Sequence, residues 1–478
     1  MLHTCVTTFL CYLSQSLLTL QSSLSSRAPQ SLIRRFITVT MSKFEEVKRE
    51  ISQYDYVRFA LCDLNGMNRG QVVAGRYAAK YMDEGVDMYE DTLLLGPRSE
   101  LVDLFHEKYY NLGNMLIFPD HYTLRSIPWA PEGVKVAEIL CESRWKKDGS
   151  PQEACPRYVA RQQFQRLSDL GFDLYSGHEI EFKLFDQETL EPVFTGEDAF
   201  SHRLFNKHSK VLFHFDKQFQ QSKIDVERYH LEIGPGLFEA VTEPKYGIES
   251  ADMAFSLQEG LLEMADAEGL RVSFMSHSVY NEMGICKHFN FSLWNRSGEN
   301  MFYDGSSPDK LSEVAKKWIA GILKHSKAIC AFANPTVNCY RNLGKLAYPS
   351  IIYWGIEDRQ SCIRVKNEGP SKTYFENRLP GGKSNLYLVV ASTIAAGLDG
   401  VIKNMECPSP GKPENGESLP LSLSEALDEL EKDEDLSNAL GKELVTWFVK
   451  SKRDSEVAKY KSVKTDEEKF AMETAAYL

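Results

Sequence analysis

The sequence lacks the features of several common protein classes. It contains no run of eighteen apolar residues, so it predicts no transmembrane helix. It contains no block rich in Lys and Arg, and its net charge of −12 argues against nucleic acid as the main partner. Its 10 Cys residues form no C-x-x-C pair, which favours reduced thiols used as small hydrophobes over a disulfide framework. We therefore expect a cytoplasmic protein with neither a membrane span nor a nucleic-acid partner.

The first forty residues lack Asp and Glu altogether. They are rich in Ser and contain Arg27, Arg34 and Arg35. A weak mitochondrial presequence, a poor signal peptide and a dispensable leader all fit this composition. The pattern typical of a folded chain begins near Met41, so we expect residues 1–40 to be a disordered leader.

The remaining chain has the composition of a globular protein, with 43% hydrophobic and 26% charged residues, and its length predicts two domains. An alternating segment over residues 56–63, an Asn-Gly turn and a second strand over 70–74 predict a hairpin, and a helix is expected over 76–84. From residue 155 helices and strands alternate. The expected helices are 156–170, 248–268, 308–328 and 384–405, and the expected strands are 173–186, 228–233, 270–277, 286–294, 351–354, 361–365 and 374–378. The sequence therefore predicts an α+β protein with domains over 41–145 and 155–478.

Three of these segments carry acids where a strand core usually carries Val, Ile or Leu: residues 177–182, 230–239 and 375–381. Side chains alternate along a strand, so Glu179 and Glu181 point to the same face. Carboxylates that close repel one another, and burying them is costly unless a cation neutralises them. The segments therefore predict a cavity lined with metal ligands.

A fourth strand, over residues 287–294, adds imidazole and amide groups on one face and aromatic residues on the other. Taken alone, its polar face could look at solvent, as in many antiparallel sheets. Four such strands in one chain favour a shared cavity. The candidate metal ligands are Glu179, Glu181, Glu232, Glu239, His288 and Glu376. An oxygen-rich set of this size suits two Mg²⁺ or Mn²⁺ ions better than structural zinc.

Three Arg residues, Arg359, Arg364 and Arg378, lie near the same strands in the sequence. They could offset the remaining negative charge or bind phosphate with two hydrogen bonds each. Surface ion pairs are the alternative interpretation for each of them.

The motifs G-x-E-x-E-F (177–182), H-x-E-x-G-P-G-x-x-E (230–239), Ser-Leu-Trp (292–294) and E-x-R-x-P (376–380) together resemble glutamine synthetase. The resemblance spans roughly residues 50–478. It implies an N-terminal β-grasp domain, and a C-terminal domain whose antiparallel strands form a curved active-site sheet or barrel. It also implies a homo-oligomeric ring, typically a dodecamer of two stacked hexamers.

The resemblance also assigns roles to individual residues. Glu181, Glu232 and Glu239 match the family's first metal site, and Glu179, His288 and Glu376 match the second. Arg359, Arg364 and Arg378 match residues that contact substrate and phosphate. Asp91 matches the ammonium-binding Asp of the N-terminal domain.

Several family positions are replaced in this chain. A catalytic Arg is replaced by Asn342, the flap Glu that accepts a proton from ammonium by Tyr348, and a phosphate-contacting Arg by Tyr374. The loop that holds glutamate is altered to Met-Gly-Ile-Cys over residues 283–286. One donor at a developing charge is worth a factor of about 10²–10³ in rate, and an Arg in phosphoryl transfer about 10³–10⁵. We therefore expect no catalytic residue to remain and predict a pseudoenzyme.

A chain that keeps the metal ligands but has lost the catalytic residues resembles a non-enzymatic branch of the family, which is found in the vertebrate eye lens. That resemblance implies a structural role as scaffold or chaperone, with intermediate filament proteins as partners. The alternative is an ATP-dependent γ-glutamyl ligase that uses an amine other than ammonia. The sequence leaves open whether ATP binds.

Overall fold

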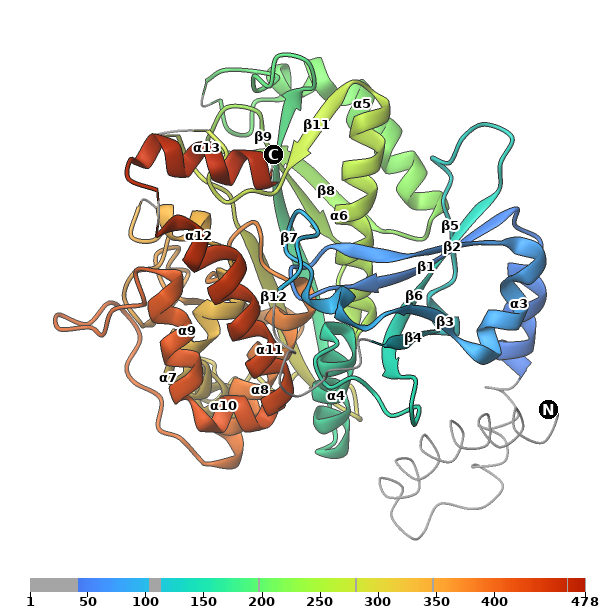
Figure 1. Ribbon diagram of the computed structural model, residues 1–478. Helices are drawn as coiled ribbons and strands as arrows, with labels where there is room; N and C mark the ends of the chain where they lie inside the picture. Colours follow the sequence, from blue (N-terminus) through green and yellow to red (C-terminus); the bar gives the residue numbers. More distant parts are fainter. Residues whose placement is uncertain are drawn as a thin grey trace, which may run out of the picture. The chain divides into compact units, whose positions relative to one another are not determined.

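The computed structural model describes residues 42–102, 113–196, 198–279, 282–345, 348–461 and 463–477, so the leader predicted over 1–40 lies outside the described residues. The chain forms two compact units (Figure 1). The first contains Met1–Leu61, Asn68–Glu90 and Leu112–Gln152, as far as these ranges are described. The second contains Cys62–Met67, Asp91–Asn111 and Glu153–Leu478, so two short segments of the N-terminal region join it.

The first unit is built on a sheet in the order β2-β1-β6-β4-β3, with β5 paired to β6. Its elements are a helix over 42–51, β1 (Tyr56–Cys62), β2 (Asn68–Ala74), α3 (Gly75–Glu84), β3 (Val86–Tyr89), β4 (Asn114–Pro119), η2 (His121–Thr123), β5 (Arg125–Ser126) and β6 (Val136–Trp145). The predicted hairpin and the helix that follows it are confirmed. Gly85 ends α3 with φ 70°, a conformation that suits glycine, and its N–H bonds the carbonyl of Tyr81.

The second unit is organised by a sheet in the order β13-β14-β15-β12-β7-β9-β8, with β10 and β11 also paired to β7. Its strands are β7 (Phe172–Asp186), β8 (Val226–Leu231), β9 (Leu237–Thr242), β10 (Lys245–Tyr246), β11 (Leu270–Ser273), β12 (Lys287–Asn295), β13 (Trp354–Ile356), β14 (Ile363–Asn367) and β15 (Thr373–Asn377). Neighbouring strands are antiparallel except β13 and β14, which are parallel. The predicted α+β class with a curved antiparallel sheet is confirmed.

Helices cover this sheet and form the rest of the second unit (Figure 1). They are η1 (Glu90–Leu94), α4 (Pro156–Asp169), α5 (His202–Gln221), α6 (Glu249–Ala267), α7 (Glu313–Ala333), η3 (Val337–Arg341), α8 (Leu386–Ile402), α9 (Leu423–Lys432), α10 (Glu434–Leu440), α11 (Lys442–Lys452), η4 (Arg453–Val457), α12 (Ala458–Tyr460) and α13 (Asp466–Tyr477). The core centres on α8, which packs on α7 and α4 and is almost entirely buried. The Asn385 side chain starts α8 by accepting hydrogen bonds from the N–H groups of Tyr387 and Leu388. No described helix is long and apolar enough to cross a membrane.

Several elements were not predicted from the sequence, β9 and α5 among them. β9 is buried at every position, so it shows no alternation of polar and apolar residues, and its one acid is buried with the rest. α5 does carry a helical signal in its buried residues Leu204, Leu212, Phe215 and Phe219. The start of α7 was also predicted five residues too early, because the Ser312 side chain caps the helix by accepting from the N–H of Ala315.

Candidate metal and substrate site

The four strands that carry predicted ligands are neighbours in the sheet, in the order β15-β12-β7-β9. In the strand register Asn290 faces Glu376 on one side and Gly177 on the other, and His288 faces Glu179. Glu181 faces Glu239 across the next pair of strands. Because facing residues in register lie on the same side of a sheet, the structure brings the predicted ligands of these strands onto one face.

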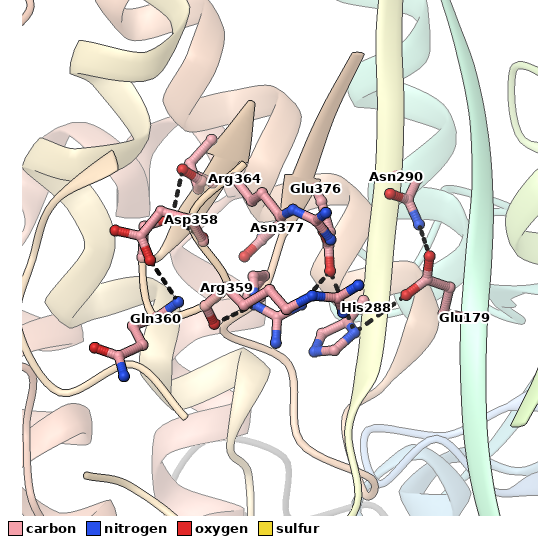
Figure 2. A network of polar contacts seen from close by, with 12 residues as sticks. Glu179, His288, Asn290, Asp358, Arg359, Gln360, Arg364, Glu376 and Asn377 are labelled. Carbon is pink, nitrogen blue, oxygen red and sulfur yellow. Dashed lines mark hydrogen bonds and ion pairs between the residues drawn. The ribbon is translucent and has the colours of Figure 1, made fainter. Parts of the chain in front are cut away.

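Glu179, His288 and Glu376 form the first cluster, and their ligand atoms lie within 4.8 Å of one another. The His288 Nδ1 atom is 3.3 Å from Glu179 Oε2 and 3.5 Å from Glu376 Oε1. Asn290 donates to Glu179 Oε1 at 3.2 Å and fixes that carboxylate from the other side (Figure 2). This cluster has the membership that the family resemblance implies for the second metal site.

His230, Glu232 and Glu239 form the second cluster. The His230 Nε2 atom lies 3.0 Å from Glu232 Oε1 and 3.5 Å from Glu239 Oε1. Sequence reasoning placed Glu232 and Glu239 here but missed His230, although its position two residues before Glu232 on a strand was a usable signal. Glu181 faces this cluster from β7 and accepts the N–H of Cys286 at 2.7 Å.

The pKa values of these carboxylates differ widely. Burial raises the pKa of Glu181 to about 8, helped by the negative charges of Glu232 and Glu179 against the Cys286 hydrogen bond. Burial likewise raises the pKa of Glu239 to about 10, and three neighbouring carboxylates add to the effect. Burial also opposes ionisation of Glu179, but its hydrogen bond and attraction to His288 outweigh this and hold its pKa at about 2. Glu181 and Glu239 therefore each retain a proton near neutral pH, and a bound cation would displace these protons.

Two of the three predicted Arg residues neutralise Glu376. Arg364 Nη1 donates to Glu376 Oε2 at 3.1 Å (Figure 2). Arg378 pairs with the other oxygen of the same carboxylate. The backbone carbonyl of Arg359 accepts from Arg378 Nε at 2.9 Å, while its side chain is exposed. Asp91 is buried in η1 and belongs to neither acidic cluster.

The chemistry of this face fits a divalent metal. The His288 Nε2 atom is buried and has no hydrogen-bond partner among the described residues, as expected of an imidazole placed to bind an ion. Carboxylate oxygens supply the remaining donors, which are the ligands that Mg²⁺ and Mn²⁺ prefer.

The replaced catalytic positions are occupied by a hydrogen-bonded network. Asn342 is buried, with Oδ1 3.0 Å from His277 Nδ1 and Nδ2 donating to the Ser276 carbonyl at 2.6 Å. Arg341, one residue earlier, turns to α13, where its Nε donates to Glu473 at 2.7 Å and its Nη1 to Asp466 at 2.9 Å. The neighbouring guanidinium is therefore committed to the C-terminal helix.

A pocket next to these residues is almost filled. Its lining includes Cys286, Asn342, Tyr348, Arg378 and Gly381, and its cavity volume is about 10 Å³. Such a volume holds about one water molecule. Burial and the nearby Cys286 thiol raise the pKa of the Tyr348 hydroxyl well above its usual value, so the phenol that replaces the family Glu stays neutral.

Aromatic residues gather on the same face of the sheet, further along β7. The rings of Tyr175 and Tyr246 are 4.7 Å apart, and the Trp294 ring meets Tyr175 edge-on at 6.5 Å. Tyr175 lies four residues before Glu179, which places it about 13 Å from the first cluster along the strand. Tyr374, the third replaced position, is on β15 with Lys366 over its ring at 5.1 Å.

Comparisons with known proteins agree with this geometry. The family model described as glutamine synthetase, catalytic domain, matches residues 153–472. Lengsin from Rattus norvegicus is 32% identical over 436 residues, covering 86% of this chain and 75% of the relative. Glutamine synthetase from Thermotoga maritima is 30% identical over 428 residues, covering 85% and 94%. A solved structure of GmaS in complex with ADP aligns with a TM-score of 0.78 at 25% identity, covering 89% and 98%. The chain belongs to the glutamine synthetase family.

Proposed function

We propose that this chain is a glutamine synthetase homologue without glutamine synthetase activity that retains a divalent-metal site and serves a structural role. The filled pocket carries the proposal. A cavity of about 10 Å³ between Asn342, Tyr348 and Arg378 does not accommodate an amino acid, and Cys286 of the loop that the family resemblance matches to the glutamate-holding loop lines it. Asn342 is locked in place by His277 and Ser276, so opening the pocket would break buried hydrogen bonds.

The loss of charge is a second support. In phosphoryl transfer a cationic side chain stabilises negative charge as it develops. Here the family Arg is a neutral amide at Asn342, and Arg341 cannot substitute because it is held by Glu473 and Asp466. The pocket therefore lacks the cation that the reaction requires at this position.

Metal binding is the part of the chemistry that the residues still support. Glu179, His288 and Glu376 would hold one ion, and Glu181, Glu232 and Glu239, with His230 beside them, the other. A bound divalent cation would supply positive charge that neutralises clustered carboxylates and polarises phosphate oxygens. The protein's own residues orient the site: Asn290 positions Glu179, and the two guanidinium groups position Glu376.

Nucleotide binding is supported by the aromatic cluster of Tyr175, Tyr246 and Trp294. Aromatic faces stack on bases, and about 13 Å separates these rings from the metal cluster along the strand. That spacing suits a nucleotide with its base on the rings and its phosphates at the metals. We propose ATP as the ligand, bound without turnover.

A second candidate function is an ATP-dependent γ-glutamyl ligase that uses an amine other than ammonia. The intact carboxylate set and the Arg pair on Glu376 favour it, because both would serve an activated acyl phosphate. Tyr348 and the altered 283–286 loop are positions where the amine and acid specificity of such an enzyme would differ. The neutral Asn342 argues against it.

The proposed role extends to assembly and partners. Membership of the family supports a homo-oligomer, and we propose a ring dodecamer of two hexamers in the cytoplasm. The 32% identity with lengsin supports a scaffold or chaperone role like that implied for the lens branch, with intermediate filament proteins as candidate partners.

ATP turnover by the full-length protein tests the proposal. The assay contains Mg²⁺ or Mn²⁺, glutamate, and either ammonium or a panel of primary amines. We expect no glutamate-dependent phosphate release from protein that is assembled and binds metal. Turnover with ammonium would overturn the inactive assignment, and turnover with one amine only would establish the ligase instead.

A further inference from the structure

A continuous row of basic residues runs along one face of α5. Its members are Arg203, Lys207, Lys210, His214 and Lys217, at successive spacings of four, three, four and three residues. At 100° per residue these positions stay within about 40° of a single line along the helix. The row is about 21 Å long, and we call it the basic row of α5.

The basic row is exposed and has no internal counter-charge. All five side chains are exposed, and none of them forms an ion pair within the described ranges. The single acid of α5, Asp216, lies on another side of the helix, where it accepts from Gln220 at 2.7 Å and from the Tyr229 hydroxyl at 3.3 Å. In a chain of net charge −12, a row of this kind is an unbalanced positive feature.

The helix beneath the row is held rigidly. Ser201 caps its first turn by accepting the N–H of Leu204, and Leu204, Leu212, Phe215 and Phe219 are buried on the opposite side. The helix packs beside α6 and β8 (Figure 1). The basic groups are therefore presented by a fixed scaffold, and the entropy lost on binding is confined to their side chains.

The shape of the row favours an elongated partner. Residues on one face of any helix recur at alternating steps of four and three, so an acidic helix lying along α5 would present its carboxylates at the same repeat. A lipid surface would instead favour large apolar side chains among the charges. The exposed Phe213 is about 80° away from the row, and the Phe200 ring stacks on His230 at 4.9 Å, so neither serves as a wedge within it.

We propose that the basic row of α5 is a docking surface for an acidic α-helix of a partner protein, one that carries carboxylates at heptad spacing. Glu and Asp side chains of such a helix would lie opposite the Arg and Lys groups in register. Steering by these charges would make association fast and dependent on salt. None of the side chains of the row belongs to an acidic cluster, so its use does not depend on whether the site turns over.

Fluorescence anisotropy of a labelled peptide tests this proposal with the full-length protein. The probe is a 21-residue Ala-based helix with Glu at the four-three spacing, and the comparison peptide has the same composition with Glu distributed around the helix. We expect the first peptide to bind several-fold more tightly, and its Kd to rise at least tenfold in the K207E/K210E variant. The charge-matched control K372E/K412E changes two exposed lysines that lie outside α5 and form no ion pair within the described ranges. It should bind like the unchanged protein.

Three outcomes would overturn the proposal. Equal loss in both double variants would show that net charge, rather than the row, attracts the peptide. Equal binding of the two peptides would show that heptad spacing is irrelevant. Binding to phosphatidylserine vesicles that is abolished by K207E/K210E, with no peptide binding, would assign the row to a membrane surface. Circular dichroism of each variant checks that it is folded, and the milder K207Q/K210Q variant should give an intermediate Kd.

Discussion

Glu376 carries a sharp prediction, because its carboxylate balances two buried guanidinium groups. The side chain is 1% exposed, and its oxygens meet Arg364 at 3.1 Å and Arg378 at a shorter distance. Replacing it by Ala removes the carboxylate that both cations share and leaves Arg364 with Glu357 as its remaining acid. Breaking a buried pair in this way costs about 3–5 kcal/mol.

The expected change in unfolding temperature follows from the size of the second unit. A unit of about 350 residues unfolds with an entropy of about 0.7 kcal/mol/K, from roughly 2.1 cal/mol/K per residue. The Glu376→Ala variant should therefore unfold about 4–7 °C below the unchanged protein in a thermal scan without metal. Glu376→Gln should lose less, because its amide oxygen still accepts one of the Arg hydrogen bonds.

Glu357→Ala is the matched control for this prediction. Glu357 also pairs with Arg364, with Arg364 Nε donating to its Oε2 at 3.1 Å, but its side chain is 47% exposed. An exposed pair contributes about 0–1 kcal/mol, so the control should change the unfolding temperature by about 1 °C or less. Equal losses in the two Ala variants would refute the argument that burial of Glu376 decides the cost.

Three further predictions concern the metal, pH and the C-terminal helix. Mn²⁺ should raise the unfolding temperature more at pH 8 than at pH 6, because binding must displace the proton held by Glu181, whose pKa is about 8; a pH-independent shift would contradict this. Burial lowers the pKa of His325, but its hydrogen bonds to Asp433 and Asp399 outweigh burial, so the net effect is a raised pKa. The protonated His325 therefore contributes its full stabilisation below about pH 6.5, and this stabilisation is lost as the pH rises through the folded-state pKa. His325→Gln should therefore lose more stability in urea unfolding at pH 6 than at pH 9, and equal losses would argue against the ion pairs. Arg341→Gln should free α13 and speed limited proteolysis near the C-terminus without creating ATP turnover; unchanged proteolysis would show that other contacts hold the helix.

Local patterns in the sequence were enough to predict the ligand-bearing face of each strand. Alternation places Glu179 and Glu181 on one side of β7 and groups His288 with Asn290 on one side of β12. The strand register decided that these are the same face of the sheet. The hairpin of the first unit and the helices α4, α6 and α8 follow in the same way, because turn residues and periodicity are properties of neighbours in the chain. The domain boundaries and the roles of the site residues stay predictions.

Only the tertiary structure showed which residues contact Asn342 and Arg341. Asn342 meets His277, 65 residues away, and Arg341 meets Glu473, 132 residues away, and no local pattern encodes either contact. The filled pocket depends on residues 378–381 after β15, on η3 and on the 283–286 loop together, so its volume cannot be read from any one of them. The sequence by itself determined which chemical groups the site contains, because residue type and strand alternation are local. Whether those groups leave room for a substrate was decided by packing between distant segments, which is a property of the folded chain.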